Sequence, residues 1–131
     1  MEFNKDLIAP CGMNCGVCKR YLATKKGINK EQKIPECLGC RFQERKCSFL
    51  KGKCEFLKKE KIKFCYECPD FPCQNLETLD KRYRTRYNTS LIGNLKEIKG
   101  RGLKRFLAAE AKKWQRPDCE GTISIHDGKC Y

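Results

Sequence analysis

Cysteine spacing constrains the fold of this chain more than any other feature of its sequence. Twelve of the 131 residues are cysteines, and ten of them lie within the first 73 residues. A share of about 9% is typical of chains that disulfides or metal ions hold together. Three Cys-x2-Cys pairs favour metal, because each can turn both sulfurs toward one tetrahedral ion at about 2.3 Å. The ten predicted metal ligands are Cys11, Cys15, Cys18, Cys37, Cys40, Cys47, Cys54, Cys65, Cys68 and Cys73.

The first three cysteines, Cys11, Cys15 and Cys18, fit three interpretations. Their C-x3-C-x2-C spacing is that of radical S-adenosylmethionine enzymes, but the chain is shorter than the roughly 200 residues of an α/β barrel. Cys15 and Cys18 have the spacing of a thioredoxin redox pair, yet no strand of adequate length precedes them in the sequence. Metal coordination remains, and we expect a fourth thiolate from residues 65–73 to complete the set.

We expect about two zinc ions, since zinc accepts four thiolates in structural sites. One partition assigns the cysteines from 37 to 54 to one ion, and those from 65 to 73 with one N-terminal cysteine to the other. A cross-braced partition instead joins the 37/40 pair to the 65/68 pair, and the spacing leaves both open. An iron–sulfur cluster is the alternative, because "CYECPDFPC" has the Cys-Pro step of bacterial ferredoxins, although their dense cysteine run is absent.

The cellular compartment also bears on the cysteines. The N-terminal residues contain only a four-residue apolar run, too short for a secretory signal, and no apolar stretch approaches the length of a membrane span. We therefore expect a cytoplasmic protein that does not associate with membranes. Thiols stay reduced in the cytosol, where Cys-x2-Cys pairs bind metal more often than they form disulfides.

Residues 74–115 contain no cysteine and show helical periodicity. A helix is expected from about residue 74, a second from Leu91 to about Gly100 with Thr89 or Ser90 as its N-cap, and a third from Leu103 to Trp114. Shorter helices are expected directly after Cys18 and over residues 54–61.

The last residues are predicted to form a small β-hairpin. Thr122–His126 alternates like a strand, with its histidine as a polar side chain, and Asp127-Gly128 suits a type I′ turn. Cys119 and Cys130, one at each end, are candidates for a weak metal site or a disulfide. The hairpin is similar to a zinc ribbon, but Arg116 stands where a ribbon has a cysteine.

These features predict a small metal-stabilised α+β fold that forms one compact unit. Residues 1–75 are the irregular cysteine-rich, zinc-binding region with short helices. Residues 76–116 are a basic helical region packed on it, and residues 117–131 are the degenerate ribbon-like hairpin.

The chain is strongly basic, with a formal net charge of +13. Two zinc ions with four thiolates each would lower this to about +9, which still favours an acidic partner such as RNA, DNA or an acidic protein. Between residues 81 and 105 there are nine basic residues and one acid. A solvated basic surface would give the same pattern. The candidate nucleic-acid contacts are Arg82, Tyr83, Arg84, Arg86, Tyr87, Lys99, Arg101, Lys104 and Arg105.

The order of the motifs resembles a known family over nearly the whole chain. "CGMNCGVC", "CLGC", "FCYECPDFPC" and "SLIGNLKEIKGRGLKRFLAAEAKKW" are similar to the prokaryotic family catalogued as domain of unknown function 3795. The segment from Cys65 to Cys73 is the most specific part. That family is regarded as zinc-binding because of its cysteines and has no established activity. The resemblance therefore implies zinc ligation by the ten N-terminal cysteines and implies no reaction.

We expect a non-catalytic zinc-binding protein that contacts nucleic acid or another acidic partner through its basic helical region. The sequence has one histidine, no zincin motif and no recognisable catalytic triad, and no small-molecule substrate is evident. The alternatives are an iron–sulfur or thiol redox protein and a protein–protein adaptor.

Overall fold

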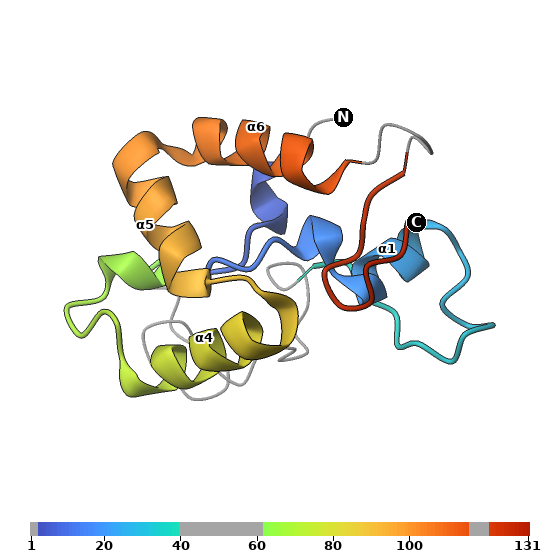
Figure 1. Cartoon of the computed structure of the whole chain (residues 1–131), viewed down its shortest axis with the longest axis horizontal. Coiled ribbons are helices and arrows are strands. Elements are labelled where there is room, and N and C mark those ends of the chain that lie inside the picture. Colours follow the sequence, from blue (N-terminus) through green and yellow to red (C-terminus); the bar gives the residue numbers. More distant parts are fainter. Residues whose placement is uncertain (1–2, 40–61, 116–120) are drawn as a thin grey trace.

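The computed structural model of the chain describes residues 3–39, 62–115 and 121–131. Within these residues the protein is small and mostly helical, with four α-helices and no β-sheet (Figure 1). The α-helices are α1 (Lys19–Lys25), α4 (Gln74–Tyr87), α5 (Leu91–Arg101) and α6 (Leu103–Trp114), and the single-turn 3-10 helices are η1 (Lys5–Leu7), η2 (Cys15–Val17) and η3 (Cys65–Glu67).

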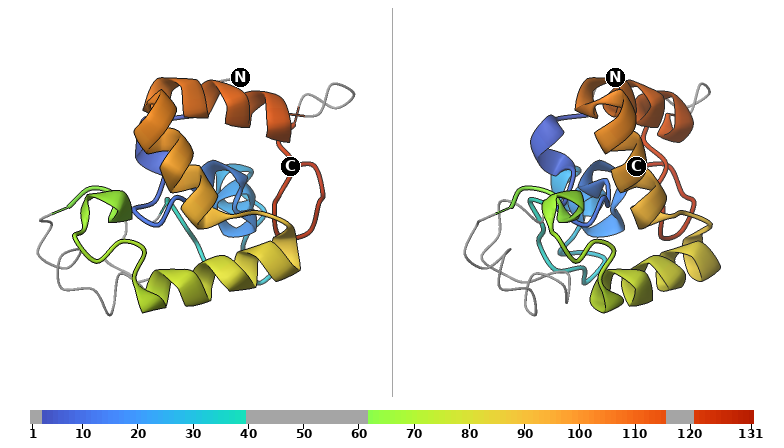
Figure 2. Two further views of the ribbon diagram at one scale, coloured as in Figure 1. Left: turned by 60° about the vertical axis from the view of Figure 1, so that its left-hand side comes forward. Right: turned by 90° about the vertical axis from the view of Figure 1, so that its left-hand side faces the viewer.

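Helices α4, α5 and α6 follow one another around three sides of the N-terminal segment (Figure 1), and the two views of Figure 2 show the same arrangement. The N-terminal loop and η2 lie within this arc. Helix α1 lies toward its open side, beside the C-terminal tail. The Ile125 amide donates a hydrogen bond of 2.9 Å to the Val17 carbonyl, which attaches the tail to the turn that contains Cys15.

Local signals set the helix boundaries. Ser90 caps α5 by accepting a hydrogen bond of 2.9 Å from the Gly93 amide, and Gly102, with φ of +93°, separates α5 from α6. Asn88 adopts the left-handed conformation that ends α4. The three helices predicted within residues 74–115 and the short helix after Cys18 are therefore confirmed. The helix predicted over 54–61 lies outside the described residues.

Asp80 joins α4 to α5. Its carboxylate accepts hydrogen bonds from the Ile92 amide and the Ser90 hydroxyl, both at 2.9 Å, and from Arg84 Nε at 2.7 Å. Burial raises the pKa of this carboxyl, but the three hydrogen bonds and the Arg84 charge outweigh that effect and hold the pKa below its ordinary value. Asp80 therefore stabilises the start of α5 as an anion.

One apolar core joins all three regions predicted from the sequence. Helix α5 lies at its centre, because Leu91 and Leu95 are fully buried and Ile98 nearly so. The core also contains residues of the N-terminal segment, α4, α6 and the tail, among them Ile8, Val17, Leu76, Phe106 and Ile125. Side chains from all three described stretches thus share one apolar core.

The C-terminal tail differs from the predicted hairpin. Its described residues contain isolated bridges, Gln115 with Thr122 and Ile123 with Cys130, rather than strands, so the β part of the predicted α+β fold is not present there. The predicted type I′ turn is wrong, because that turn needs positive φ at both central residues and only Gly128 of the pair has it, at +68°. Backbone hydrogen bonds within the tail, between Thr122 and Tyr131 and from Ser124 to Lys129, hold it together without forming named strands. The Ile123 and Ile125 amides attach it to neighbouring elements by donating to the Trp114 and Val17 carbonyls.

Candidate functional site

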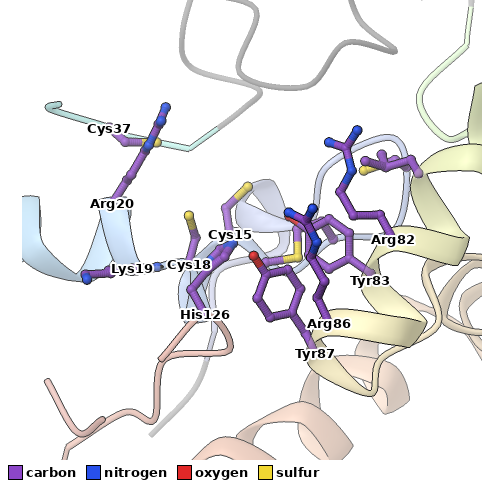
Figure 3. Close-up of a pocket in the computed structure, with 13 residues that line it drawn as sticks. Cys15, Cys18, Lys19, Arg20, Cys37, Arg82, Tyr83, Arg86, Tyr87 and His126 are labelled. Atoms are coloured by element: carbon purple, nitrogen blue, oxygen red, sulfur yellow. Dashed lines mark hydrogen bonds between the residues drawn. The ribbon is translucent and has the colours of Figure 1, made fainter. Parts of the chain in front are cut away.

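Four cysteines line one cavity of about 500 Å³ (Figure 3). Cys11, Cys15 and Cys18 come from the N-terminal motif, and Cys37 comes from the segment that follows α1. Each is a thiol rather than half of a disulfide. Cys11, Cys15 and Cys37 are buried, at 4%, 2% and 2% exposure, and the first two belong to the apolar core.

A tight loop positions the first of these thiols. Ile8 and Asn14 form an antiparallel bridge, and the Ala9 amide donates to the Met13 carbonyl at 2.8 Å, so the chain reverses around Cys11. The Asn14 side chain then caps η2 by accepting a hydrogen bond of 2.9 Å from the Gly16 amide. This cap fixes the turn on which the second thiol lies.

Helix α1 positions the other two thiols. Cys18 is its N-cap residue, and the Cys18 carbonyl accepts from the Leu22 amide at 2.9 Å. At the other end of the helix, the Thr24 hydroxyl accepts a hydrogen bond of 2.9 Å from the Cys37 amide. The segment after α1 is thereby folded back so that its cysteine lies on the same cavity as the N-terminal motif.

The remaining wall of the cavity is cationic and aromatic. Lys19 and Arg20 of α1 and Arg82 and Arg86 of α4 line it, and no carboxylate does so among the described residues. The two α4 arginines are four residues apart and so lie on one face of the helix, together with Tyr83 and Tyr87. Positive charge near a thiol favours the thiolate, the form that binds metals.

His126 also lies on this cavity, although its sequence context predicted a polar strand residue. Its Nδ1 accepts a hydrogen bond of 3.3 Å from the Lys19 amide, and its ring meets the Tyr87 ring edge-on with centroids 5.0 Å apart. Two elements distant in sequence, α1 and α4, therefore fix this histidine. Nδ1 is the acceptor, so any proton on the neutral ring is on Nε2.

The four cysteines on the cavity have the donor atoms of a thiolate metal site, but their sulfurs are not arranged around one point. Four sulfurs are the ligands of a structural zinc site. Among the described residues, however, no three cysteine, histidine or acidic side chains converge on one point as metal ligands do. The four thiols line the walls of the cavity instead, so a single ion would have to draw them together.

The other predicted ligands lie elsewhere. Cys65, Cys68 and Cys73 are thiols that do not line this cavity, although the Cys65 amide donates to the Pro10 carbonyl at 2.9 Å. The sequence predicted a fourth ligand from residues 65–73; the fourth cysteine on this cavity is Cys37, while Cys65 lies next to the N-terminal motif without lining the cavity. Cys130 is disulfide-bonded. Cys40, Cys47, Cys54 and Cys119 lie outside the described residues.

The predicted nucleic-acid contacts do not form one face. Arg82, Tyr83, Arg86 and Tyr87 line the thiol cavity, whereas Arg84 pairs with Asp80 and lines a separate cavity. The other four belong to the corner between α5 and α6, which lies across the molecule from the end of α4 (Figure 1). These four exposed residues are Lys99, Arg101, Lys104 and Arg105.

A buried polar contact, not predicted from the sequence, supports the cysteine loop. Asn14 Nδ2 donates to Glu110 Oε1 at 3.4 Å, and both residues are buried, at 2% and 7% exposure. Burial raises the pKa of the Glu110 carboxyl more than Lys113 and Asn14 lower it. The sequence did contain a signal for this contact, namely a glutamate on the apolar face of a predicted helix. Charged residues are rarely buried without a partner, so its position indicated a polar contact.

Replacing Glu110 by glutamine is expected to stabilise the protein at pH 7 by about 1 kcal/mol, the lower end of what an incompletely satisfied buried polar group costs. Burial disfavours the charged carboxylate, whereas the amide of glutamine is neutral. The folded-state pKa of Glu110 is raised, so its contribution to stability is complete below its ordinary value of 4.5 and is lost as the pH rises through the raised pKa. Urea unfolding of both proteins between pH 4 and pH 8 measures this. Curves that stay parallel across the range would contradict the assignment.

The fold and the cavity define a small, mostly helical protein with a thiol-lined site. The family model described as "Protein of unknown function (DUF3795)" matches residues 7–78, more than half of the chain, and the chain belongs to that family. The matched segment contains all four cavity cysteines and the first turn of α4. No curated protein and no solved structure matches the chain. Among the described residues, no helix has the length and apolar character needed to cross a membrane.

Proposed function

We propose that this protein binds a metal ion in the cavity through the thiolates of Cys11, Cys15, Cys18 and Cys37, and that the metal is zinc. The observation behind the proposal is that four thiols from two segments of the chain line one cavity. An all-sulfur set of four is the donor set of closed structural zinc sites, which have no open position for a substrate. The proposed role is therefore structural and not catalytic.

The charge around the thiols supports the same proposal. One dication and four thiolates sum to −2, a charge that would be costly among buried groups without compensation. Lys19, Arg20, Arg82 and Arg86 line the cavity and supply that compensation. The ion would join the N-terminal loop to the segment after α1, and its binding free energy would add to folding. Such a site requires a reducing compartment such as the cytoplasm.

An iron–sulfur cluster is the second candidate. Its thiolates bind different iron atoms of one cluster and need not converge on a single ion. Four thiols on the walls of one cavity are therefore also a donor set for such a cluster.

The test is metal analysis of anaerobically purified protein and of two variants, Cys15→Ser and Cys37→Ser. Each variant is expected to lose one zinc ion per chain relative to the unchanged protein, because each removes a ligand of the same site. Elemental analysis gives the metal and its amount, and a visible spectrum with acid-labile sulfide would identify a cluster instead.

Met13→Leu is the matched control, since Met13 also places a sulfur on this cavity but has no thiolate. This variant should retain the full metal content. If both cysteine variants keep as much metal as the unchanged protein, the ion is bound elsewhere and the proposed site is wrong.

A further inference from the structure

We propose that the cationic side of the same cavity binds the phosphate group of a small molecule. The groups that carry this inference are Arg82 and Arg86 of α4 and Lys19 and Arg20 of α1, which line one cavity without a carboxylate among the described lining residues. Four positive side chains around one concave site form an anion site, because arginine matches the oxygens of a phosphate with paired N–H donors.

The two α4 arginines are placed to act together. They are four residues apart on one helical face, and Figure 3 shows both side chains extending from α4 over the cavity. Both are exposed, whereas three of the four thiols are buried. The cavity thus combines buried thiols with an accessible cationic rim. Lys19 also contacts Asp127 at 3.5 Å, and the planar guanidinium groups of Arg82 and Arg86 suit a phosphate better than an ammonium does.

The shape of the site selects the ligand. A cavity of about 500 Å³ lies within the range of roughly 300–1,000 Å³ that small-molecule sites occupy, whereas a nucleic-acid duplex needs an open basic face. The basic residues of the α5–α6 corner lie apart from this rim (Figure 1). The two groups therefore do not form the continuous basic surface that a duplex would contact. Tyr83 and Tyr87 line the cavity beside the arginines and offer contact area to an organic group.

A metal ion bound by the thiols would not prevent anion binding at the cationic rim. A zinc ion with four thiolates has a net charge of −2, while Arg82 and Arg86 keep their N–H donors at the exposed rim of the cavity. The anion site depends on the arginines and stands with or without the metal.

The experiment is titration calorimetry of the full chain in low-salt buffer with three probes: inorganic phosphate, AMP and adenosine. Phosphate and AMP are expected to bind at one site and to compete, and adenosine is expected to give no binding. AMP that binds more tightly than phosphate would assign the ligand to the nucleotides, and equal affinities would assign it to simple phosphate compounds. In the double variant Arg82→Gln/Arg86→Gln, affinity for both anions should fall at least about tenfold.

The matched control is Lys81→Gln/Arg105→Gln, which removes the same two charges from exposed positions that do not line this cavity. Its anion affinity should stay close to that of the unchanged protein. If both double variants lose anion affinity equally, the loss follows from net charge and not from the cavity, and the inference is wrong. Absence of phosphate and AMP binding would also overturn it.

Two further measurements keep the result interpretable. Arg86→Lys retains the charge and should bind phosphate with intermediate affinity, while circular dichroism confirms that each variant is folded. Metal content is measured on the same samples. Metal without anion binding would overturn this inference alone, and anion binding without metal at Cys15 and Cys37 would overturn the proposed function alone.

Discussion

Replacing Gly12 by alanine is expected to destabilise the protein by about 3 kcal/mol. Gly12 has φ of +91°, a conformation that costs a residue with a side chain roughly 1–2 kcal/mol. A Cβ at this position would lie 2.6 Å from the Leu91 carbonyl oxygen and 3.0 Å from Leu95 Cγ. Relief of such crowding in a packed core costs roughly another 1–3 kcal/mol.

The crowding has a structural origin. The cysteine loop approaches the backbone of α5 at Gly12, whose carbonyl accepts a hydrogen bond of 3.0 Å from Asn94 Nδ2. A side chain would push the loop away from α5 and would move the neighbouring Cys11 relative to the other thiols. Denaturant unfolding measures the loss of stability, and metal content measured in parallel should fall as well if the proposed centre is present.

Gly102→Ala is the matched control for this prediction. Gly102 has nearly the same φ, +93°, but nothing lies within 4 Å of a Cβ built there. It should show only the conformational cost, roughly 1–2 kcal/mol. If the two variants are equally destabilised, the contact between the cysteine loop and α5 contributes nothing and the packing argument is wrong.

Asp80→Asn is expected to destabilise the protein by about 2 kcal/mol at pH 7, in the range of hydrogen bonds made to charged groups. The carboxylate accepts from Ser90, Ile92 and Arg84 at once. An asparagine of the same shape has one acceptor oxygen, and its NH2 group would face donors. Denaturant unfolding at pH 7 gives the difference directly.

The effect of Asp80 depends on pH with a defined sign. Its folded-state pKa lies below the ordinary value of 3.8, so the stabilisation is complete above that value and is lost as the pH falls through the lowered pKa. The difference between the unchanged protein and Asp80→Asn should therefore shrink in acid. Glu97→Gln is the control, because Glu97 and Arg101 form an ion pair with the same i, i+4 spacing on the exposed surface of α5. Such exposed pairs contribute at most about 0.5 kcal/mol to stability. A comparable loss in both variants would contradict the role of burial at Asp80.

The helical half of the fold was predictable from local signals. Apolar spacing and the Ser90 cap predicted α5, and Gly102 predicted the break before α6, because these signals act over one or two turns of chain. The C-terminal tail was not predictable in this way. Alternation in Thr122–His126 suggested a strand, but the pairing inside the tail stops at isolated bridges. The Ile123 and Ile125 amides donate to Trp114 and Val17, contacts that local alternation does not predict.

The candidate site was predictable in part. Sequence spacing indicated Cys11, Cys15 and Cys18 as a group, because residues only three or four positions apart in the chain cannot lie far apart in space. The fourth thiol on the cavity depends on how the segment after α1 folds back, and spacing favoured residues 65–73 over Cys37. The roles of Asn14 and Glu110 were missed for the same reason, since 96 positions separate them in the chain.

The sequence by itself determined the residue types and the local structure: a cysteine-rich N-terminal half, a basic helical segment and membership of the family. These follow from composition, short spacings and caps, which need no knowledge of distant contacts. Only the tertiary structure decided which cysteines share a cavity, and which arginines face that cavity rather than solvent or Asp80. That outcome depends on α4 and the tail closing against the N-terminal loop, and burial of one common core determines this closure.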